Sequence, residues 1–188
     1  MAISTIDSTG LQSPLANQSL SSPTLSNPTF TGTATGTVLV SGTAQASTSG
    51  SNIDFSSIPS WVKRITIVFN EVSTTGSTII LAQLGTGGTP TTSGYLSTKI
   101  EINTSGSATS YTSGHGIVSG SASNVSSGQI VFCNLSGNIW IGSGSVKQST
   151  SFMSFSNSSV TLSGTLNFLR ITCSGDTFDA GSINILYE

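Results

Sequence analysis

Histidine is the side chain most often used for acid-base catalysis near neutral pH, and this 188-residue sequence contains one, His115 in the segment SGHGIV. A Ser-His-Asp hydrolase sets its histidine between a nucleophilic serine and an acidic residue, and α/β-hydrolases carry that serine in a GxSxG turn from strand to helix. No such turn is present, and serine is so frequent here that its closeness to a histidine carries no information. We therefore expect no enzymatic activity and interpret His115 as an exposed loop residue.

The close acidic pair Asp176 and Asp179, in GDTFDAG, is the remaining candidate for acid-base or metal chemistry. Glycosidases need two carboxyl groups that face each other across a cleft, and calcium needs several oxygen ligands, as in a DxDxDG loop, which this sequence lacks. Aspartate side chains also hydrogen-bond the backbone of tight turns. We interpret both residues as part of a turn between two strands and predict no metal and no other cofactor.

Sugar recognition needs aromatic faces with hydroxyl or amide neighbours. Trp61 in SWVKRI and Trp140 in NIWIG alternate with apolar residues, so we assign them to the core or to an interface. The candidates for contact with a receptor or glycan are then Tyr111, His115 and Tyr95, with Asn103 as a polar partner.

Two cysteines lie in apolar, strand-like runs, Cys133 in IVFCNL and Cys173 in RITCSG. Their spacing matches no CxxC or Cys/His metal motif. We interpret both as small buried hydrophobic residues, and a disulfide between them stays open as the alternative.

Charge is sparse: five Lys plus Arg and seven Asp plus Glu give a net charge of −2, and charged residues are 6% of the chain. Five cations cannot supply the phosphate contacts on which nucleic-acid binding depends, and no apolar run approaches the roughly 18 residues of a membrane span. The first residues lack the basic and apolar pattern of a signal peptide. We expect synthesis in a cytoplasm, without nucleic acid or membrane insertion.

Short alternating segments separated by Gly, Ser, Asn and Asp predict an all-β antiparallel sandwich over residues 41–188. The clearest segment is 61–72, in which Lys63, Ile65, Ile67 and Phe69 face one way. Further strands are expected at 78–84, 95–102, 128–135, 138–141, 151–155, 160–162, 166–173 and 182–187. The Ser- and Gly-rich stretch 103–128 is predicted to be a long exposed loop.

Residues 1–40 differ from the rest, because they hold three of the five prolines and no long alternating run. Within them SPTLS (22–26) is followed directly by NPTFT (27–31), a tandem echo. Proline fixes φ and forces its predecessor into extended geometry. We expect an extended N-terminal attachment arm, whose anchors are Pro23, Leu25, Pro28 and Phe30.

Three segments resemble bacteriophage tail-fibre and virion-surface proteins: IPSWVKRITIVFNEVST with the following TGSTIILAQLGTGGTPTTSGY (58–95), DTFDAGSINILYE (176–188) and the linker-like NPTFTGTATG (27–36). The resemblance implies a jelly-roll-like β-sandwich module that forms homotrimers and projects from a virion. Tail fibres of this kind carry a long shaft and a tail-anchoring domain, and neither is recognisable before the module here.

The resemblance therefore favours a trimeric capsid decoration, or cement, protein whose arm binds the major capsid protein and whose knob faces outward on the virion surface. A tail-fibre tip that attaches to tail proteins and recognises a host surface glycan or protein is the alternative.

Overall fold

The structure, a computed structural model, describes residues 39–102, 106–149 and 152–188, and these belong to one compact unit, Thr37–Glu188. The predicted arm residues Pro23, Leu25, Pro28 and Phe30 lie outside the described residues, as does Asn103. Within the described ranges the chain forms strands and turns and no helix, so no helix there has the length and hydropathy to span a bilayer.

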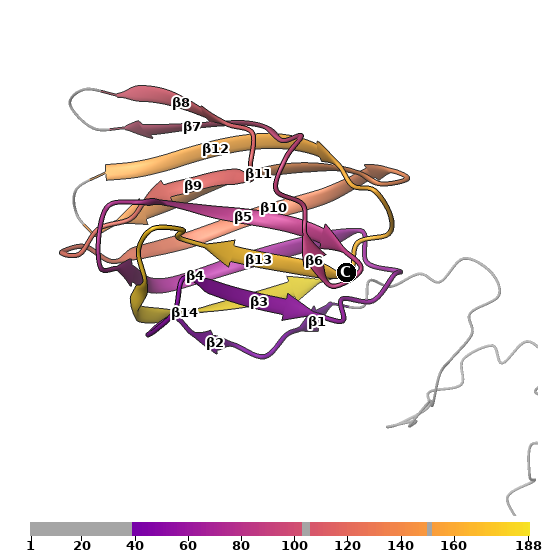
Figure 1. The fold of residues 1–188 in the computed structure, drawn as a ribbon, viewed down its shortest axis with the longest axis horizontal. Coiled ribbons are helices and arrows are strands. Elements are labelled where there is room, and N and C mark those ends of the chain that lie inside the picture. The colour runs from indigo at the N-terminus through magenta and orange to yellow at the C-terminus, as the bar shows by residue number, and fades with distance from the viewer. Residues whose placement is uncertain (1–38, 103–105, 150–151) are drawn as a thin grey trace, which may run out of the picture. The chain divides into compact units, whose positions relative to one another are not determined.

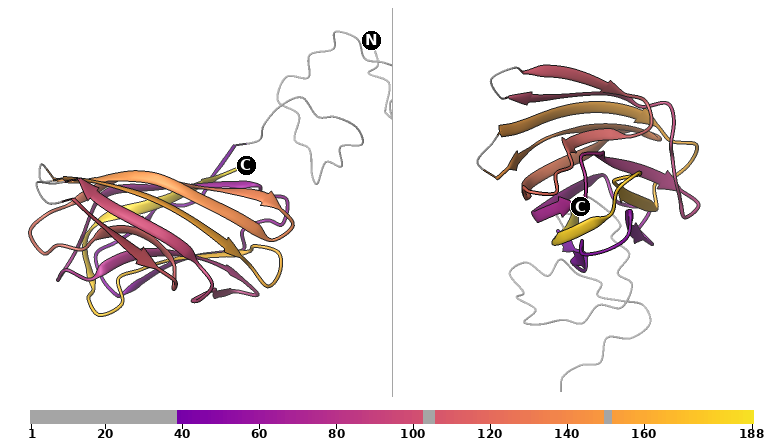
Figure 2. Two further views of the ribbon diagram at one scale, coloured as in Figure 1. Left: turned by 90° about the horizontal axis from the view of Figure 1, so that it is seen from above. Right: turned by 60° about the vertical axis from the view of Figure 1, so that its left-hand side comes forward.

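Two antiparallel sheets pack face to face, which confirms the predicted all-β sandwich (Figures 1 and 2). The larger sheet runs in the order β1-β14-β4-β10-β11-β12-β7-β8, with β2 also paired to β14. Its strands are β1 (Val40–Ser41), β2 (Gln45–Ala46), β4 (Arg64–Thr74), β7 (Leu96–Ile102), β8 (Ser107–Tyr111), β10 (Ser126–Ser136), β11 (Ile139–Gln148), β12 (Phe152–Thr161) and β14 (Phe178–Tyr187).

The smaller sheet has five strands in the order β3-β13-β5-β6, with β9 paired to the other part of β5. These are β3 (Asn52–Ser56), β5 (Ile79–Thr86), β6 (Thr89–Pro90), β9 (His115–Ser119) and β13 (Phe168–Thr172). In Figure 1 the smaller sheet lies in front of the larger one, and β7, β8 and β12 lie together at the top.

The main core lies where β4, β10 and β14 face β5 and β13. Alternation holds from Arg64 on: Ile65, Ile67 and Phe69 are buried, while Thr66 and Val68 face outward. The predicted strand began at residue 61, but Lys63 precedes β4 and is exposed, and Val62 is buried, so the alternation does not extend to them. Cross-strand partners continue the same layer, because Ile67 pairs with Ile130 on β10 and with Ile185 on β14. Burial of this apolar surface is the main driving force for folding of such a domain.

A bulge at Glu71 interrupts both ladders of β4 near the C-terminal end of the strand. Glu71 has φ of 53°, and both ladders that flank β4 shift register beside it. Gly181 on β14 lies so close that a Cβ there would come within 2.4 Å of the Glu71 carbonyl oxygen. Its own φ of 91° also favours glycine, so the bulge requires this residue type on the neighbouring strand.

The stretch 103–128 is not the long exposed loop that its composition predicts. It contains β8 and β9, and four of the five residues of β9 are buried between the sheets. Small residues make this placement possible, since a Cβ on Gly116 would meet the ring of Tyr111 at 2.5 Å. The Ser- and Gly-rich composition therefore has two different outcomes, because β8 is exposed whereas Gly114–Val118 is closely packed and buried.

Candidate functional site

His115 is fully buried, so its interpretation as an exposed loop residue is wrong. It lies at the start of β9, and its two ring nitrogens each contact a serine hydroxyl of β12: Nδ1 lies 2.7 Å from Ser158 Oγ and Nε2 lies 2.7 Å from Ser156 Oγ. The edge of the ring meets Phe132, with 5.2 Å between ring centroids.

The contacts between His115 and the two serines resemble those of a catalytic base and its nucleophile. All three side chains are buried, however, so a substrate could not reach them. Burial lowers the pKa of His115 to about 4, so the ring is neutral at neutral pH, with one nitrogen that donates and one that accepts a hydrogen bond. Both ring nitrogens contact serines that are themselves buried, and among the described residues no carboxylate bonds the ring. The group fixes β9 against β12 and presents no reactive atom to solvent.

The other predicted contact residues are also occupied inside the fold. Tyr95 is buried, and its hydroxyl accepts a hydrogen bond of 2.7 Å from the backbone N–H of Leu84, so its assignment to a surface site is wrong. Burial raises the pKa of the Tyr95 hydroxyl far above its usual value. Tyr111, at the end of β8, is half-buried with its ring over Gly116. The structure therefore groups Tyr111 and His115 around β9, but as packing partners.

Asp176 lies in the turn before β14, as predicted, but Asp179 lies within β14, and the two carboxylates bind different, distant segments of the chain. Asp176 accepts a hydrogen bond of 2.7 Å from the backbone N–H of Thr78, and hydrogen bonding to the side chain and then to the backbone of Thr78 lowers the pKa of its carboxyl group. Asp179 accepts a hydrogen bond from the Ser73 hydroxyl. Among the described residues no three His, Cys, Asp or Glu side chains converge as metal ligands would.

The two cysteines have opposite environments, and neither forms a disulfide. Cys173 is buried as predicted, and burial, followed by the nearby Asp176 carboxylate, raises the pKa of its thiol to about 11. Cys133 is exposed, so its assignment to the core is wrong: it lies on the outer face of β10, between Arg64 and Ile141. The tryptophans also differ, because Trp140 is buried and Trp61 is 49% exposed.

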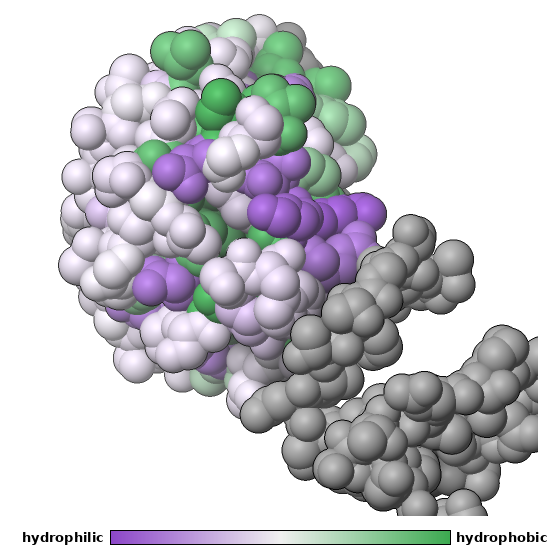
Figure 3. Space-filling view, turned by 90° about the vertical axis from the view of Figure 1, so that its right-hand side faces the viewer, coloured by the Kyte–Doolittle hydropathy of each residue, from purple (hydrophilic) through white to green (hydrophobic). Residues whose placement is uncertain are grey.

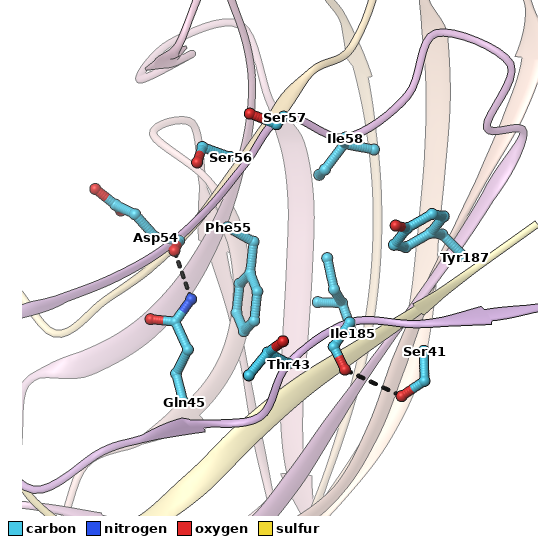
Figure 4. Close-up of a pocket in the computed structure, with 11 residues that line it drawn as sticks. Ser41, Thr43, Gln45, Asp54, Phe55, Ser56, Ser57, Ile58, Ile185 and Tyr187 are labelled. Carbon is cyan, nitrogen blue, oxygen red and sulfur yellow. Dashed lines mark hydrogen bonds between the residues drawn. The ribbon is translucent and has the colours of Figure 1, made fainter.

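A polar groove of about 350 Å³ opens where the edge strands β2 and β3 leave the two sheets apart (Figure 4). Its floor is formed by Phe55, Ile58 and Ile185, and its rim by serine and threonine hydroxyls. The Gln45 amide bridges the two sheets by donating a hydrogen bond of 2.7 Å to the Asp54 carbonyl oxygen. The Asp54 carboxylate is held by Arg170 in two bonds of 2.7 Å each, so the groove offers no free acid-base pair.

The outer face of the larger sheet is the most unusual surface of the molecule. Along β7 and the first half of β12 the large apolar side chains face outward, together with Thr98 and Asn157, while serines and Lys99 face the interior. Exposed side chains include Ile100, Ile102, Met153 and Phe155, which we call the outer apolar patch. A different side, the end of the molecule that lies at the right in Figure 1, also carries hydrophobic residues in its upper part, above a hydrophilic band (Figure 3).

Interior polar residues opposite this patch are fully paired. Ser97 Oγ accepts a bond of 3.0 Å from the backbone N–H of Gly116. Lys99, 3% exposed, donates to Glu101 and to Ser119 Oγ. Burial acts to raise the pKa of Glu101, but hydrogen bonds from Lys99 and Ser119 outweigh it and lower the value. No buried side-chain nitrogen or oxygen of the described residues lacks a hydrogen-bond partner.

Alternation alone does not show which face of β7 is inside, but the sequence contains a further indication of it. The segment LSTKIEI alternates strictly, and either set of side chains could face the core. Apolar residues were the natural choice for the inside, yet Leu96, Ile100 and Ile102 are the exposed set. The single histidine and the serines at 156 and 158 were the clue, because they match each other as hydrogen-bonding partners.

Comparisons of the chain with protein-family models, with curated proteins and with solved structures find no match.

Proposed function

We propose that this protein is a structural component of a bacteriophage virion, a trimeric capsid decoration protein whose jelly-roll-like sandwich projects as a knob and whose N-terminal arm, residues 1–40, binds the major capsid protein. The phage assignment rests on the resemblance of segments 27–36, 58–95 and 176–188 to virion-surface proteins. Its mechanism is mass action: a protein that binds only the assembled shell stabilises that shell against disassembly.

One observation of the structure carries the assembly role, namely the apolar and hydroxyl-rich outer face of the larger sheet. Charged residues are depleted from the centres of protein interfaces because burying an unpaired charge is costly. Along β12 and β7 the outward residues from Met153 to Asn157 and from Leu96 to Ile102 include no charged side chain. A face of this kind favours contact with other proteins over binding of charged ligands.

The receptor-binding alternative has weaker support. Of the three residues assigned to receptor contact, Tyr95 and His115 are buried and Tyr111 packs over Gly116. We therefore place the decoration role first.

The test is to find the protein on the particle. Labelled antibody or quantitative mass spectrometry of purified virions should give hundreds of copies on the head, whereas a few tens on the tail would reject the decoration role. In parallel, full-length Leu25→Ser/Phe30→Ser and a variant without residues 1–35 should keep the circular dichroism of a folded β protein but fail to bind undecorated heads. Binding at the wild-type level by both variants would reject the arm.

A further inference from the structure

Polarity is inverted across the sheet at β7 and β12. An antiparallel sheet that is solvated on one face places its apolar residues inward and its polar residues outward. Here Ser97, Lys99, Ser154, Ser156 and Ser158 are buried, and Ile100, Ile102, Met153 and Phe155 are 38–56% exposed. In a domain that stayed alone in water, each of these outward apolar side chains would forfeit the free energy of burial.

The inversion is fixed by the interior. A slip of one residue would turn every side chain of a strand to the other face. Such a slip on β12 would remove both serine hydroxyls from His115, and one on β7 would remove Ser97 Oγ from the Gly116 N–H and Lys99 from Ser119. Because an unpaired buried polar group costs about 1–3 kcal/mol, the outward position of the apolar set is a defined feature of the fold.

The outer apolar patch is continuous across two strands. Phe155 lies directly opposite Ile100 in the ladder, and Met153 lies opposite Ile102. Beside them the surface is hollowed into a depression of about 460 Å³, lined by Ile102, Lys147, Ser149, Phe152, Met153 and Phe155. Lys147 alone carries a charge there, and it is exposed, so its ammonium group can remain in water while its stem covers apolar surface.

The size of the face matches a contact between protein subunits. Leu96 and Ile141 continue it along the same side of the sheet and are 76% and 40% exposed. With about 150–250 Å² for a fully exposed large side chain, the six apolar residues present on the order of 500 Å². Intervening neutral residues, among them Ser143, Asn157 and Thr98, bring the face toward the roughly 800 Å² that each partner contributes to a stable interface.

We propose that the outer apolar patch binds a second copy of this chain and forms the subunit contact of the homotrimer. A second copy fits because the face carries both donors and acceptors on its serine, threonine and asparagine residues, and because its charged residue, Lys147, is exposed and can keep its ammonium group in water. The trimeric stoichiometry rests on the proposed function, whereas the contact surface rests on the inversion alone.

The test is the mass of the full-length protein in solution, measured by light scattering after gel filtration. Wild type should have about three times the monomer mass of 19.1 kDa. Phe155→Glu should reduce the mass threefold, to that of the monomer, because it places a carboxylate in the centre of the patch. The matched control is Leu135→Glu, which changes an equally apolar and 68% exposed residue beside the β10–β11 turn and should keep the wild-type mass.

Folding is checked by thermal melting of each variant. If Phe155→Glu does not fold, Ile102→Glu at the end of β7 replaces it, because that residue is 56% exposed. A monomeric wild type, or a folded patch variant that keeps the wild-type mass, would overturn the inference. The inference would also be overturned if the isolated wild-type protein is a monomer and needs Phe155 to bind heads or a host glycan. The patch would then bind a partner other than a second copy.

The two proposals fail separately. A monomer that still decorates heads rejects the subunit contact and leaves the decoration role. A trimer that depends on Phe155 but is missing from virions rejects the decoration role and leaves the contact.

Discussion

The interior of the sandwich has two halves of opposite chemistry. In one half Ile65, Ile67 and Phe69 of β4 pack with apolar residues of β10, β14, β5 and β13. In the other, β9 is held against β7 and β12 by serine hydroxyls, the His115 imidazole and the Lys99 ammonium group. Phe132 marks the boundary, because its ring belongs to the apolar cluster and also contacts His115.

The comparison shows that hydrogen bonding can decide which face of a strand is inside. The apolar half gains its stability from the burial of apolar surface. This free energy is large and depends only weakly on the exact geometry of the contacts. The polar half gains little net free energy from each hydrogen bond but loses much when one partner is missing. A polar interior therefore fixes the register of its strands. The apolar side chains of the same strands then lie on the outer face, where they can contact another protein.

The largest effect is expected in the apolar half. Ile67→Ala should reduce the free energy of unfolding by roughly 2–5 kcal/mol, because it removes buried methyl groups and leaves a cavity. Urea denaturation measures the change. The matched control is Val68→Ala on the outward side of the same strand, which should cost under about 1 kcal/mol; equal losses for both would contradict the assignment of inner and outer faces.

Acid should weaken the polar half. The pKa of His115 is lowered from 6.5 to about 4 in the folded protein, so between these values the unfolded chain binds more protons, and stability must fall as the pH falls from 6.5 toward 4. The loss should reach about 3 kcal/mol at pH 4.

The control for this pH dependence is His115→Gln, whose amide can still bond both serines but does not titrate. Measured by urea denaturation at each pH, the wild-type curve should slope between pH 4.5 and 6.5 and the variant curve should be flat there. Parallel curves would show that His115 is not the titrating group.

Space around His115 is also limiting, which gives a smaller effect. A Cβ on Gly142 would lie 2.6 Å from the Phe132 ring and 2.9 Å from His115 Nδ1. Gly142→Ala should therefore destabilise the protein by roughly 1–3 kcal/mol through overpacking. Gly137→Ala is unsuitable as a control, because the positive φ of Gly137 would strain any side chain. The control is Gly106→Ala, because a Cβ there would lie 3.5 Å from its nearest neighbour, the Glu101 carbonyl oxygen, which is an ordinary contact. Thermal melting distinguishes them, and equal shifts would argue against crowding.

The smallest effect is expected outside both halves. The Arg64 guanidinium contacts the Glu188 carboxylate at 3.0 Å on the surface, and the Arg64 side chain is 51% exposed. Arg64→Gln should change stability by at most about 1 kcal/mol, because solvent and salt screen exposed ion pairs. A loss that exceeds that of Gly142→Ala would reverse the order predicted here.

Sequence patterns predicted the apolar half well and the polar half poorly. Alternation in β4 predicted that Ile65, Ile67 and Phe69 share a face, and the structure places that face in the core. The same rule fails for β7, where the inward set contains Lys99 and Glu101. Their burial depends on Ser119 and on each other, and a contact of that kind between distant segments leaves no trace in the periodicity of a single strand.

Composition misled in a similar way around β9. Gly114, His115 and Gly116 read as loop residues because glycine and serine surround them. In the fold, glycine at 116 makes room for the Tyr111 ring, and His115 has hydrogen-bonding partners more than 40 residues away in the chain. Candidate ligand residues chosen for aromatic or polar character, such as Tyr95, were for the same reason interior residues with a local partner.

The position of β14 has a consequence for biosynthesis. This strand, Phe178–Tyr187, lies between β1 and β4 in the larger sheet, and its backbone also anchors β2. Until the ribosome has released these residues, β4 has an open edge and the N-terminal strands have nothing to pair with. Folding of the sandwich therefore cannot be completed before Tyr187 has left the ribosome, and a nascent chain stalled before residue 178 would expose an unpaired β4 edge to aggregation.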